Sequence, residues 1–188
     1  KVAKDSSDQS LVDKLPPYIF IIHGSVPELR KMSKFDGMGL YYDSSPTLEH
    51  ILKSIETPFG KSYYLDGEDA KKYLEFFKYA MEFARKKRKV IAEHIFSKDF
   101  TLISNTMHQG LISYGEMLIG CQTWNHDNTH DTLFPLTLRS DLPAFLLTIT
   151  PSLSDEIIEA RGFEKRAKKN NTFQFLKEFN CIPHGGGY

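Results

Sequence analysis

The sequence has little cysteine, no net charge and no long apolar run. Its two cysteines, Cys121 and Cys181, are too few for a disulfide framework or a four-thiolate zinc site, which favours a reducing compartment. The 24 basic and 24 acidic residues cancel to a formal net charge of zero, so we expect no nucleic-acid partner. The basic run at residues 85–89 is interpreted as a solvated helix face. No segment approaches the roughly 18 apolar residues of a membrane helix, and no membrane span is expected.

What the chain does have is enough apolar surface for one domain. Of its 188 residues, 40% are hydrophobic and 13% are aromatic, which suffices for a sizeable core. Residues 1–15 are polar and charged and stop before Pro16-Pro17, so they are predicted to be a flexible leader. Residues 16–188 are predicted to form a single domain. Because the sequence starts without Met and stops on a glycine run, we expect the remaining domains of a longer chain as partners.

Periodicity and turn residues predict an α+β fold with a small sheet and a large helical portion. Continuous apolar runs indicate strands at residues 18–22, 39–42 and 143–149, with 61–65 as a short strand or a loop. Helices are predicted at 27–34, from Pro46 after the Ser45 cap to the break at Thr57-Pro58, and at 68–96, 104–120 and 152–167, with 172–179 as a helix or a strand. In the longest helix, the predicted inward stripe is Tyr73, Phe77, Ala80, Ala84, Ile91 and Ile95.

Two short motifs accompany the first two predicted strands. The first is His23-Gly24-Ser25, and the second is a glycine- and tyrosine-rich run that contains Gly39, Tyr41 and Tyr42. An imidazole at a strand end can hydrogen-bond a ribose hydroxyl, and a glycine lets a ligand approach the backbone closely. A serine can donate to a carboxamide or phosphate oxygen, and a tyrosine can stack on a flat ring. Together the motifs predict a nucleotide pocket; the alternative is that both are ordinary turns.

These motifs resemble the ADP-ribosyltransferase superfamily, on its poly(ADP-ribose)-polymerase and diphtheria-toxin side. The resemblance implies that His23 holds the ribose of NAD, that Gly24 and Ser25 meet the nicotinamide carboxamide, and that Tyr41 stacks on nicotinamide. It also implies a late catalytic glutamate, for which Glu178 is the candidate, and a protein acceptor for the transferred ADP-ribose. The gap between the two motifs is shorter than is usual in the polymerases.

A looser resemblance rests on composition and on the pair Tyr63-Tyr64, which Tyr73 follows. These features are similar to domains of bacterial secreted effectors, among them the KLAMP type, an adenine-nucleotide-binding module that clamps the base between tyrosines. This resemblance implies ADP or a related nucleotide such as cyclic AMP as the ligand, without a need for catalysis. It also implies delivery into a host cytosol as an alternative to a cytoplasmic location. Under both resemblances NAD or ADP is the expected ligand, and no metal is expected.

A polar loop supports a third function of a different class. Its two His-Asp pairs, His126-Asp127 and His130-Asp131, are four residues apart and would place two imidazoles on one metal ion if the loop were helical. His108 could add a third nitrogen, which would give a metal-dependent phosphohydrolase or phosphodiesterase. The alternative is a solvated loop, because the intervening Asn-Asp-Asn-Thr composition is typical of turns.

Overall fold

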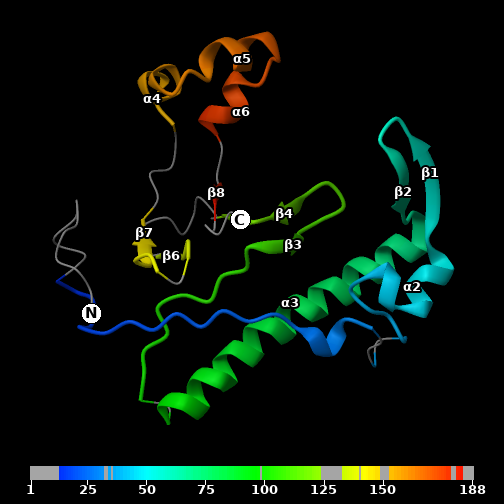
Figure 1. Cartoon of the computed structure of the whole chain (residues 1–188), viewed down its shortest axis with the longest axis horizontal. Helices are drawn as coiled ribbons and strands as arrows, with labels where there is room; N and C mark the ends of the chain where they lie inside the picture. Colours follow the sequence, from blue (N-terminus) through cyan, green and yellow to red (C-terminus); the bar gives the residue numbers. More distant parts are fainter. Residues whose placement is uncertain are drawn as a thin grey trace.

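One long helix, α3 (Gly67–Phe96), supports the N-terminal half of the chain (Figure 1). The computed structural model describes residues 13–31, 34, 36–97, 99–123, 133–139, 141–148, 153–178 and 181–183. Helix α3 has Glu68 and Asp69 in its first turn, where acidic side chains interact favourably with the helix dipole, and it ends at Ser97 in the left-handed conformation (φ 51°). The helix predicted at 68–96 is confirmed.

The segment before α3 contains two 3₁₀ turns, η1 (Pro27–Leu29) and η2 (Tyr42–Ser44), and the helix α2 (Pro46–Ile51). Ser45 caps α2 as predicted, because its side-chain oxygen accepts a hydrogen bond from the Leu48 amide at 3.3 Å. The helix is shorter than predicted. Strand β1 (Lys53–Thr57) follows it and pairs antiparallel with β2 (Gly60–Tyr64), so a strand rather than a loop occupies most of 61–65.

Two of the three predicted strands are wrong. Residues 18–22 are extended but pair with no described strand; instead they lie along α3, where the rings of Phe20 and Phe96 have centroids 4.8 Å apart. Residues 39–42 lie beside η1, where one of their amides donates to the Leu29 carbonyl at 3.0 Å, and then enter η2. Both apolar runs pack against helical elements, which apolar character alone does not distinguish from packing within a sheet.

The other strands form three more two-stranded antiparallel sheets. These pair β3 (Gln109–Leu111) with β4 (Met117–Ile119), β5 (Cys121–Thr123) with β8 (Cys181–Pro183), and β6 (Phe134–Leu136) with β7 (Phe145–Leu147). The strand predicted at 143–149 is confirmed as the shorter β7. The helix predicted at 104–120 is wrong, because Gly110 (φ 142°) has a conformation foreign to a helix and lies in the middle of β3, paired with Leu118 in the β3–β4 hairpin.

Three short helices form the C-terminal part of the fold: α4 (Asp155–Ala160), α5 (Glu164–Lys169) and α6 (Phe173–Lys177). Figure 1 shows them together, away from α2 and the β1–β2 hairpin. The predicted helix 152–167 divides in two at Gly162 (φ 70°), and Ser154 caps its first described turn. The described part of 172–179 is helical rather than extended.

The buried core lies between the N-terminal segment and α3. Its members are Leu29, Met38, Leu48, Phe76 and Ala80. The predicted α+β class with a large helical portion is confirmed, although the strands form four small sheets rather than one. None of the helices in the described ranges is long and apolar enough to cross a membrane.

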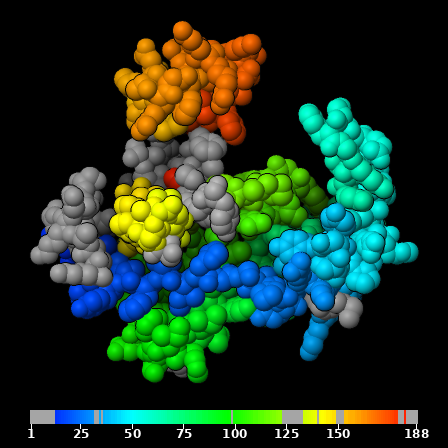
Figure 2. Space-filling view, viewed as in Figure 1, coloured from blue at the N-terminus to red at the C-terminus, as the bar shows by residue number. Residues whose placement is uncertain are grey.

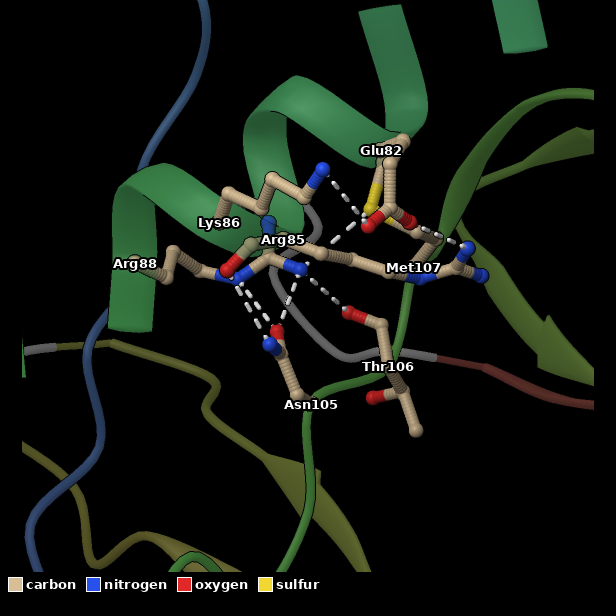
Figure 3. A network of polar contacts seen from close by, with 7 residues as sticks. All are labelled: Glu82, Arg85, Lys86, Arg88, Asn105, Thr106 and Met107. Carbon is tan, nitrogen blue, oxygen red and sulfur yellow. Dashed lines mark hydrogen bonds and ion pairs between the residues drawn. The ribbon is translucent and has the colours of Figure 1, made fainter. Parts of the chain in front are cut away.

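Arg88 joins α3 to the segment that precedes β3 (Figure 3). Its guanidinium donates to Asn105 Oδ1 at 2.6 and 2.9 Å and to the Thr106 carbonyl at 3.3 Å. The Asn105 side chain donates in turn to the Arg85 carbonyl at 3.1 Å. Burial, and then the neighbouring Arg85, lower the pKa of Arg88. This residue of the basic run therefore has a structural role.

The remaining cations of the basic run lie beside carboxylates. The nitrogen–oxygen distances are 3.8 Å for Arg85–Glu82, 3.7 Å for Lys86–Glu82, 2.6 Å for Lys87–Glu28 and 3.9 Å for Lys89–Glu93. Cations that each have an acidic neighbour offer little net charge to a phosphate-rich partner. Arg85, Lys86 and Lys89 are exposed, as expected of a solvated helix face, whereas Lys87 and Arg88 are partly buried and bond to other segments, so the interpretation of the whole run 85–89 as a solvated face holds only in part.

Candidate functional site: a tyrosine-lined cavity

A cavity of about 410 Å³ lies where the α2 region, β2, α3 and the β3–β4 hairpin meet. Tyrosines dominate its wall, with leucines between them. The tyrosines are Tyr41, Tyr42, Tyr63, Tyr64, Tyr73 and Tyr114, and the leucines are Leu40, Leu48, Leu52, Leu65, Leu74 and Leu111. Figure 2 shows the β1–β2 hairpin (cyan) projecting beside the β3–β4 hairpin (green), and both contribute to the wall. The volume and the mostly apolar lining are typical of a small-ligand site.

Four residues predicted to bind the ligand meet in this cavity: Tyr41, Tyr42, Tyr63 and Tyr64. The Tyr42 and Tyr63 rings contact each other, with centroids 4.8 Å apart and planes inclined by 31°. Each of the four side chains is 44 to 51% exposed, so ring surface remains available for stacking. The second motif and the Tyr63-Tyr64 pair are therefore parts of one site, although the sequence linked them to different families.

Tyr73 reaches the cavity from α3 and is held in place by its hydroxyl. That hydroxyl donates to the Leu40 carbonyl at 2.9 Å, and the ring lies 6.0 and 6.1 Å from the rings of Phe76 and Phe77. Burial, and then the nearby Tyr41, raise the pKa of Tyr73 to about 12. The phenol therefore stays protonated at neutral pH and keeps its hydrogen bond to the segment that carries Tyr41 and Tyr42.

The raised pKa of Tyr73 predicts a loss of stability in alkali. Below pH 10 the phenol is neutral in both states, whereas between pH 10 and about 12 it ionises only in the unfolded chain, and the stability it contributes is lost. We expect the stability difference between wild type and Tyr73→Phe to fall by on the order of 2 kcal/mol as the pH rises through this window. Urea denaturation of both proteins from pH 8 to 11.5 measures it, and a difference that does not change with pH would contradict it.

Gly39 and Ser45 fix the backbone on either side of Tyr41 and Tyr42. Ser45 is buried, and its side-chain oxygen accepts from the Gly39 amide at 2.9 Å as well as capping α2. A Cβ atom at position 39 would lie 2.2 Å from the Lys31 carbonyl oxygen, so only glycine fits there. Gly39 was predicted to touch the ligand; it is buried outside the cavity wall, and its bond to Ser45 positions the residues that form the wall.

Two cations lie over rings of the cavity. The Arg30 guanidinium carbon is 5.7 Å from the centroid of Tyr41, and the Lys61 ammonium is 5.5 Å from the centroid of Tyr63. Neither cation forms an ion pair with another residue that the structure describes. Neither cation lines the cavity, but each places a positive charge beside one of its tyrosine rings.

The first motif, His23-Gly24-Ser25, does not line this cavity. His23 Nε2 lies 3.0 Å from His108 Nε2, and the Ser25 carbonyl accepts a hydrogen bond from Lys87 at 3.2 Å. A Cβ atom on Gly24 would meet nothing within 4 Å. The structure thus separates the two motifs that the transferase resemblance places around one nicotinamide.

The candidate catalytic residue Glu178 also lies outside the cavity. It follows α6, is exposed, and accepts a hydrogen bond from Gln174 at 2.7 Å. In Figure 1, α6 is far from the β1–β2 hairpin, whose strand β2 carries the cavity residues Tyr63 and Tyr64. In the structure Glu178 is therefore an exposed side chain at the C-terminal end of α6, outside the tyrosine cavity.

The residues of the metal alternative, His126, Asp127, His130 and Asp131, lie outside the described residues. Within the described ranges, no three or more His, Cys, Asp or Glu side chains gather closely enough to hold a metal ion. His108, the possible third nitrogen, faces His23 edge to edge, with the two Nε2 atoms 3.0 Å apart and the ring centroids 5.2 Å apart.

Several residues of the cavity were missed by the sequence analysis. Leu111, Ser113 and Tyr114 belong to the β3–β4 hairpin, which was predicted to be a helix, so they were not connected with the tyrosines of the cavity. The pair of glycines Gly110 and Gly115 was the available signal, because glycines in a helical pattern often mark a turn.

The chain was compared with protein-family models, curated proteins and solved structures. No family model, curated protein or solved structure matches it. The two family resemblances therefore stay predictions, and the function has to be argued from the site.

Proposed function

We propose that the chain binds an adenine nucleotide, with the base against the tyrosines of the cavity. The observation that carries the proposal is the convergence of Tyr41, Tyr42, Tyr63, Tyr64 and Tyr73 from three parts of the chain on one apolar cavity. A buried tyrosine packs on its neighbours, whereas four of these rings remain about half exposed and face a shared space. Planar rings with free faces bind flat heteroaromatic ligands by stacking.

The distances indicate where the base enters. The Tyr42 and Tyr63 rings are in contact at 4.8 Å, and a base between two rings needs a centroid separation of roughly twice the 3.5 Å contact distance. The base therefore stacks on the free face of one ring, or it separates the pair by a movement of the β1–β2 hairpin. Because β1 and β2 are exposed along their whole length apart from Thr57, the hairpin can move without opening the core.

Arg30 and Lys61 favour a ligand with phosphates. Each cation lies over the ring of a cavity tyrosine and has no ion-pair partner among the described residues, so the phosphate of a nucleotide whose base stacks on Tyr41 or Tyr63 would find positive charge nearby. A nucleoside diphosphate such as ADP has this division into a flat apolar base and an anionic tail. The same chemistry in NAD makes it the second ligand to test.

Binding without catalysis is the form of the proposal that the geometry favours. ADP-ribosyl transfer would need His23 at the ribose and a glutamate at the reacting carbon, and both His23 and Glu178 lie on elements outside the cavity wall. We therefore propose that the chain is a nucleotide-binding module. The sequence resemblance suggests that the module belongs to an effector protein that acts on a host target.

Calorimetric titration of wild type with ADP, NAD, cyclic AMP and GDP tests the proposal. We expect ADP to bind, and Tyr63→Ala to weaken it by roughly 5- to 150-fold, because base–aromatic stacking contributes about 1–3 kcal/mol. Tyr63→Phe keeps the ring and should retain most of the affinity. Tyr18→Ala is the matched control, since Tyr18 is exposed and does not line this cavity.

Three results would count against the proposal. No binding of any adenine nucleotide at millimolar concentration, or an equal loss of affinity in Tyr18→Ala, would remove the cavity as a nucleotide site. Equal affinity for GDP would remove the preference for adenine. Consumption of NAD that His23→Ala abolishes would support the transferase instead.

A further inference from the structure

A second cavity, of about 330 Å³, lies outside the tyrosine site. Its wall is formed by residues 16–22, the last turns of α3, residues 99–106 and the β6–β7 sheet. None of the described residues lines both cavities, so the proposed nucleotide site leaves this one without a role. The volume is within the range of small-ligand sites.

One end of this second cavity is aromatic. The rings of Phe20 and Phe100 have centroids 4.8 and 6.1 Å from that of Phe96, and their planes are inclined to it by 44° and 58°. Because the rings are tilted, these pairs offer no two parallel faces that could enclose a flat ligand ring. Ile19 and Leu146 continue the apolar wall from two other segments. A flexible alkyl chain suits this wall better than a planar base does.

The other end of the second cavity carries positive charge. Arg88 lines it there, roughly 12 Å along the helix axis from Phe96 at about 1.5 Å per residue. Arg88 is partly buried, and its guanidinium donates to uncharged oxygens of Asn105 and Thr106 (Figure 3). None of the described residues forms an ion pair with Arg88. An anionic ligand group would therefore add the charge-assisted hydrogen bond that this cation lacks.

Two other charged side chains favour one direction for an anionic ligand. Lys89 lines the cavity next to Arg88, so both cations lie at the same end. Asp99 also lines the cavity, but at the aromatic end, where its amide donates to the Phe96 carbonyl at 2.8 Å. A ligand carboxylate is attracted to the first end and repelled from the second.

Ser104 provides a further polar group near Arg88, because it precedes Asn105 in the chain and lines the same cavity. Its hydroxyl oxygen is shielded from solvent and has no hydrogen-bond partner in the part of the chain that the structure describes. A buried hydroxyl without a partner costs free energy, and a ligand oxygen would offset that cost once the side chain changes its rotamer toward the cavity.

We propose that this second cavity binds a medium-chain fatty acid, with its carboxylate at Arg88 and its alkyl chain directed toward Phe96. The distance of roughly 12 Å between the two residues along the helix suits an extended chain of about eight carbon atoms. The site uses none of the cavity tyrosines, so it does not depend on nucleotide binding.

Calorimetric titration of the wild-type protein with octanoate, octanol and octylamine tests the proposal, because the three ligands share a tail and differ in charge. We expect octanoate to bind at least tenfold more tightly than octanol, since only the carboxylate forms charge-assisted hydrogen bonds with Arg88. Octylamine should bind more weakly still, because its ammonium meets two cations. Tyr63→Ala should leave the affinity for octanoate unchanged, because Tyr63 lines the other cavity.

A variant that fills the second cavity tests the position of the site. Leu146→Trp places a larger side chain in the wall and should weaken octanoate binding at least tenfold. Leu138→Trp is the matched control, because Leu138 is 41% exposed and lies outside the wall, so its affinity should equal that of wild type. Arg88→Gln should remove the preference for octanoate over octanol. Because Arg88 also bonds to Asn105, far-ultraviolet circular dichroism has to confirm that this variant is folded.

Three results would overturn the proposal. The first is no binding of octanoate at millimolar concentration, and the second is affinities for octanoate and octanol within twofold of each other. The third is an equal loss of affinity in Leu146→Trp and Leu138→Trp. The first two are measured on the wild-type protein, so they decide the proposal even if a variant fails to fold.

Discussion

Replacing Gly39 with alanine is expected to lower the free energy of unfolding by about 3 kcal/mol, at the upper end of the usual cost of overpacking. A Cβ atom at this position would lie 2.2 Å from the Lys31 carbonyl oxygen and 2.7 Å from the Arg30 carbonyl oxygen. Both atoms belong to the backbone, so no side-chain rotation relieves the contact. Relief requires the chain at residues 30–31 to move away from position 39, which breaks the packing of Met38 and Leu29. Urea denaturation measures the change.

The same substitution should also weaken nucleotide binding. The Gly39 amide is hydrogen-bonded to Ser45, so a displaced residue 39 shifts Tyr41 and Tyr42 in the cavity wall. Gly115→Ala is the control for stability, because a Cβ atom there meets nothing within 4 Å, and we expect a change within about 0.5 kcal/mol. If Gly39→Ala unfolds at the same urea concentration as Gly115→Ala, the close approach of the two backbone segments is wrong.

The Gly24→Ala variant tests whether Gly24 contacts the ligand, as the transferase resemblance implies, or lies outside the binding site. The transferase resemblance makes Gly24 a point of contact with the ligand, so it predicts weaker binding of NAD or ADP in this variant. The tyrosine cavity does not include Gly24, and a Cβ atom there meets nothing within 4 Å. We therefore expect Gly24→Ala to bind as wild type does, in contrast to Gly39→Ala.

Local signals in the sequence predicted some helices and not others: the helix predicted at 104–120 is the β3–β4 hairpin, and the one predicted at 27–34 is only the 3₁₀ turn η1. The apolar period of residues 68–96 and the Ser45 cap followed by proline each describe contacts within a few residues, and α3 and the start of α2 form where expected. The continuous helix predicted at 152–167 is interrupted at Gly162, whose positive φ ends α4 and turns the chain into α5.

Contacts between distant segments could not be predicted from these signals. The apolar run 18–22 has the composition of a buried strand, but its neighbours are α3 and residues 99–106, which line one cavity with it. A sequence pattern gives the apolar character of a segment and not the identity of its neighbour. For the same reason, the analysis recognised Tyr41, Tyr42, Tyr63 and Tyr64 as ring surfaces but did not show that they share a cavity.

Which face of α3 is buried is the feature of the fold that mutations test most directly. The predicted stripe included Phe77 and Ile95, whereas the structure buries Phe76 completely and leaves Ile95 57% exposed. The helix contacts different partners along its length: Phe76 and Ala80 meet Leu29 and Met38 in the core, while Phe77 lies against the β3–β4 hairpin at Gly110. One stripe of a single period cannot describe a long helix with two packing faces.

Phe76→Ala is accordingly expected to lower the free energy of unfolding by about 3–5 kcal/mol, the range for a fully buried phenylalanine. Such a loss is a large part of the stability of a small domain, so Phe76→Leu is the variant that stays folded, with an expected cost below about 1.5 kcal/mol. Phe59→Ala is the exposed control, because Phe59 is 100% exposed at the β1–β2 turn, and we expect no change beyond about 0.5 kcal/mol. Urea denaturation compares the three variants.

Phe77→Ala decides between the two faces of α3. The side chain is half-buried and borders the hairpin that carries Tyr114, so its truncation should cost less than that of Phe76 while weakening nucleotide binding more. The opposite order in stability would mean that the predicted stripe is the core face of α3. The N-terminal segment would then pack elsewhere on the helix, and Tyr41 and Tyr42 would no longer lie opposite the β3–β4 hairpin. The tyrosine cavity therefore depends on the rotation of α3 that puts Phe76 in the core.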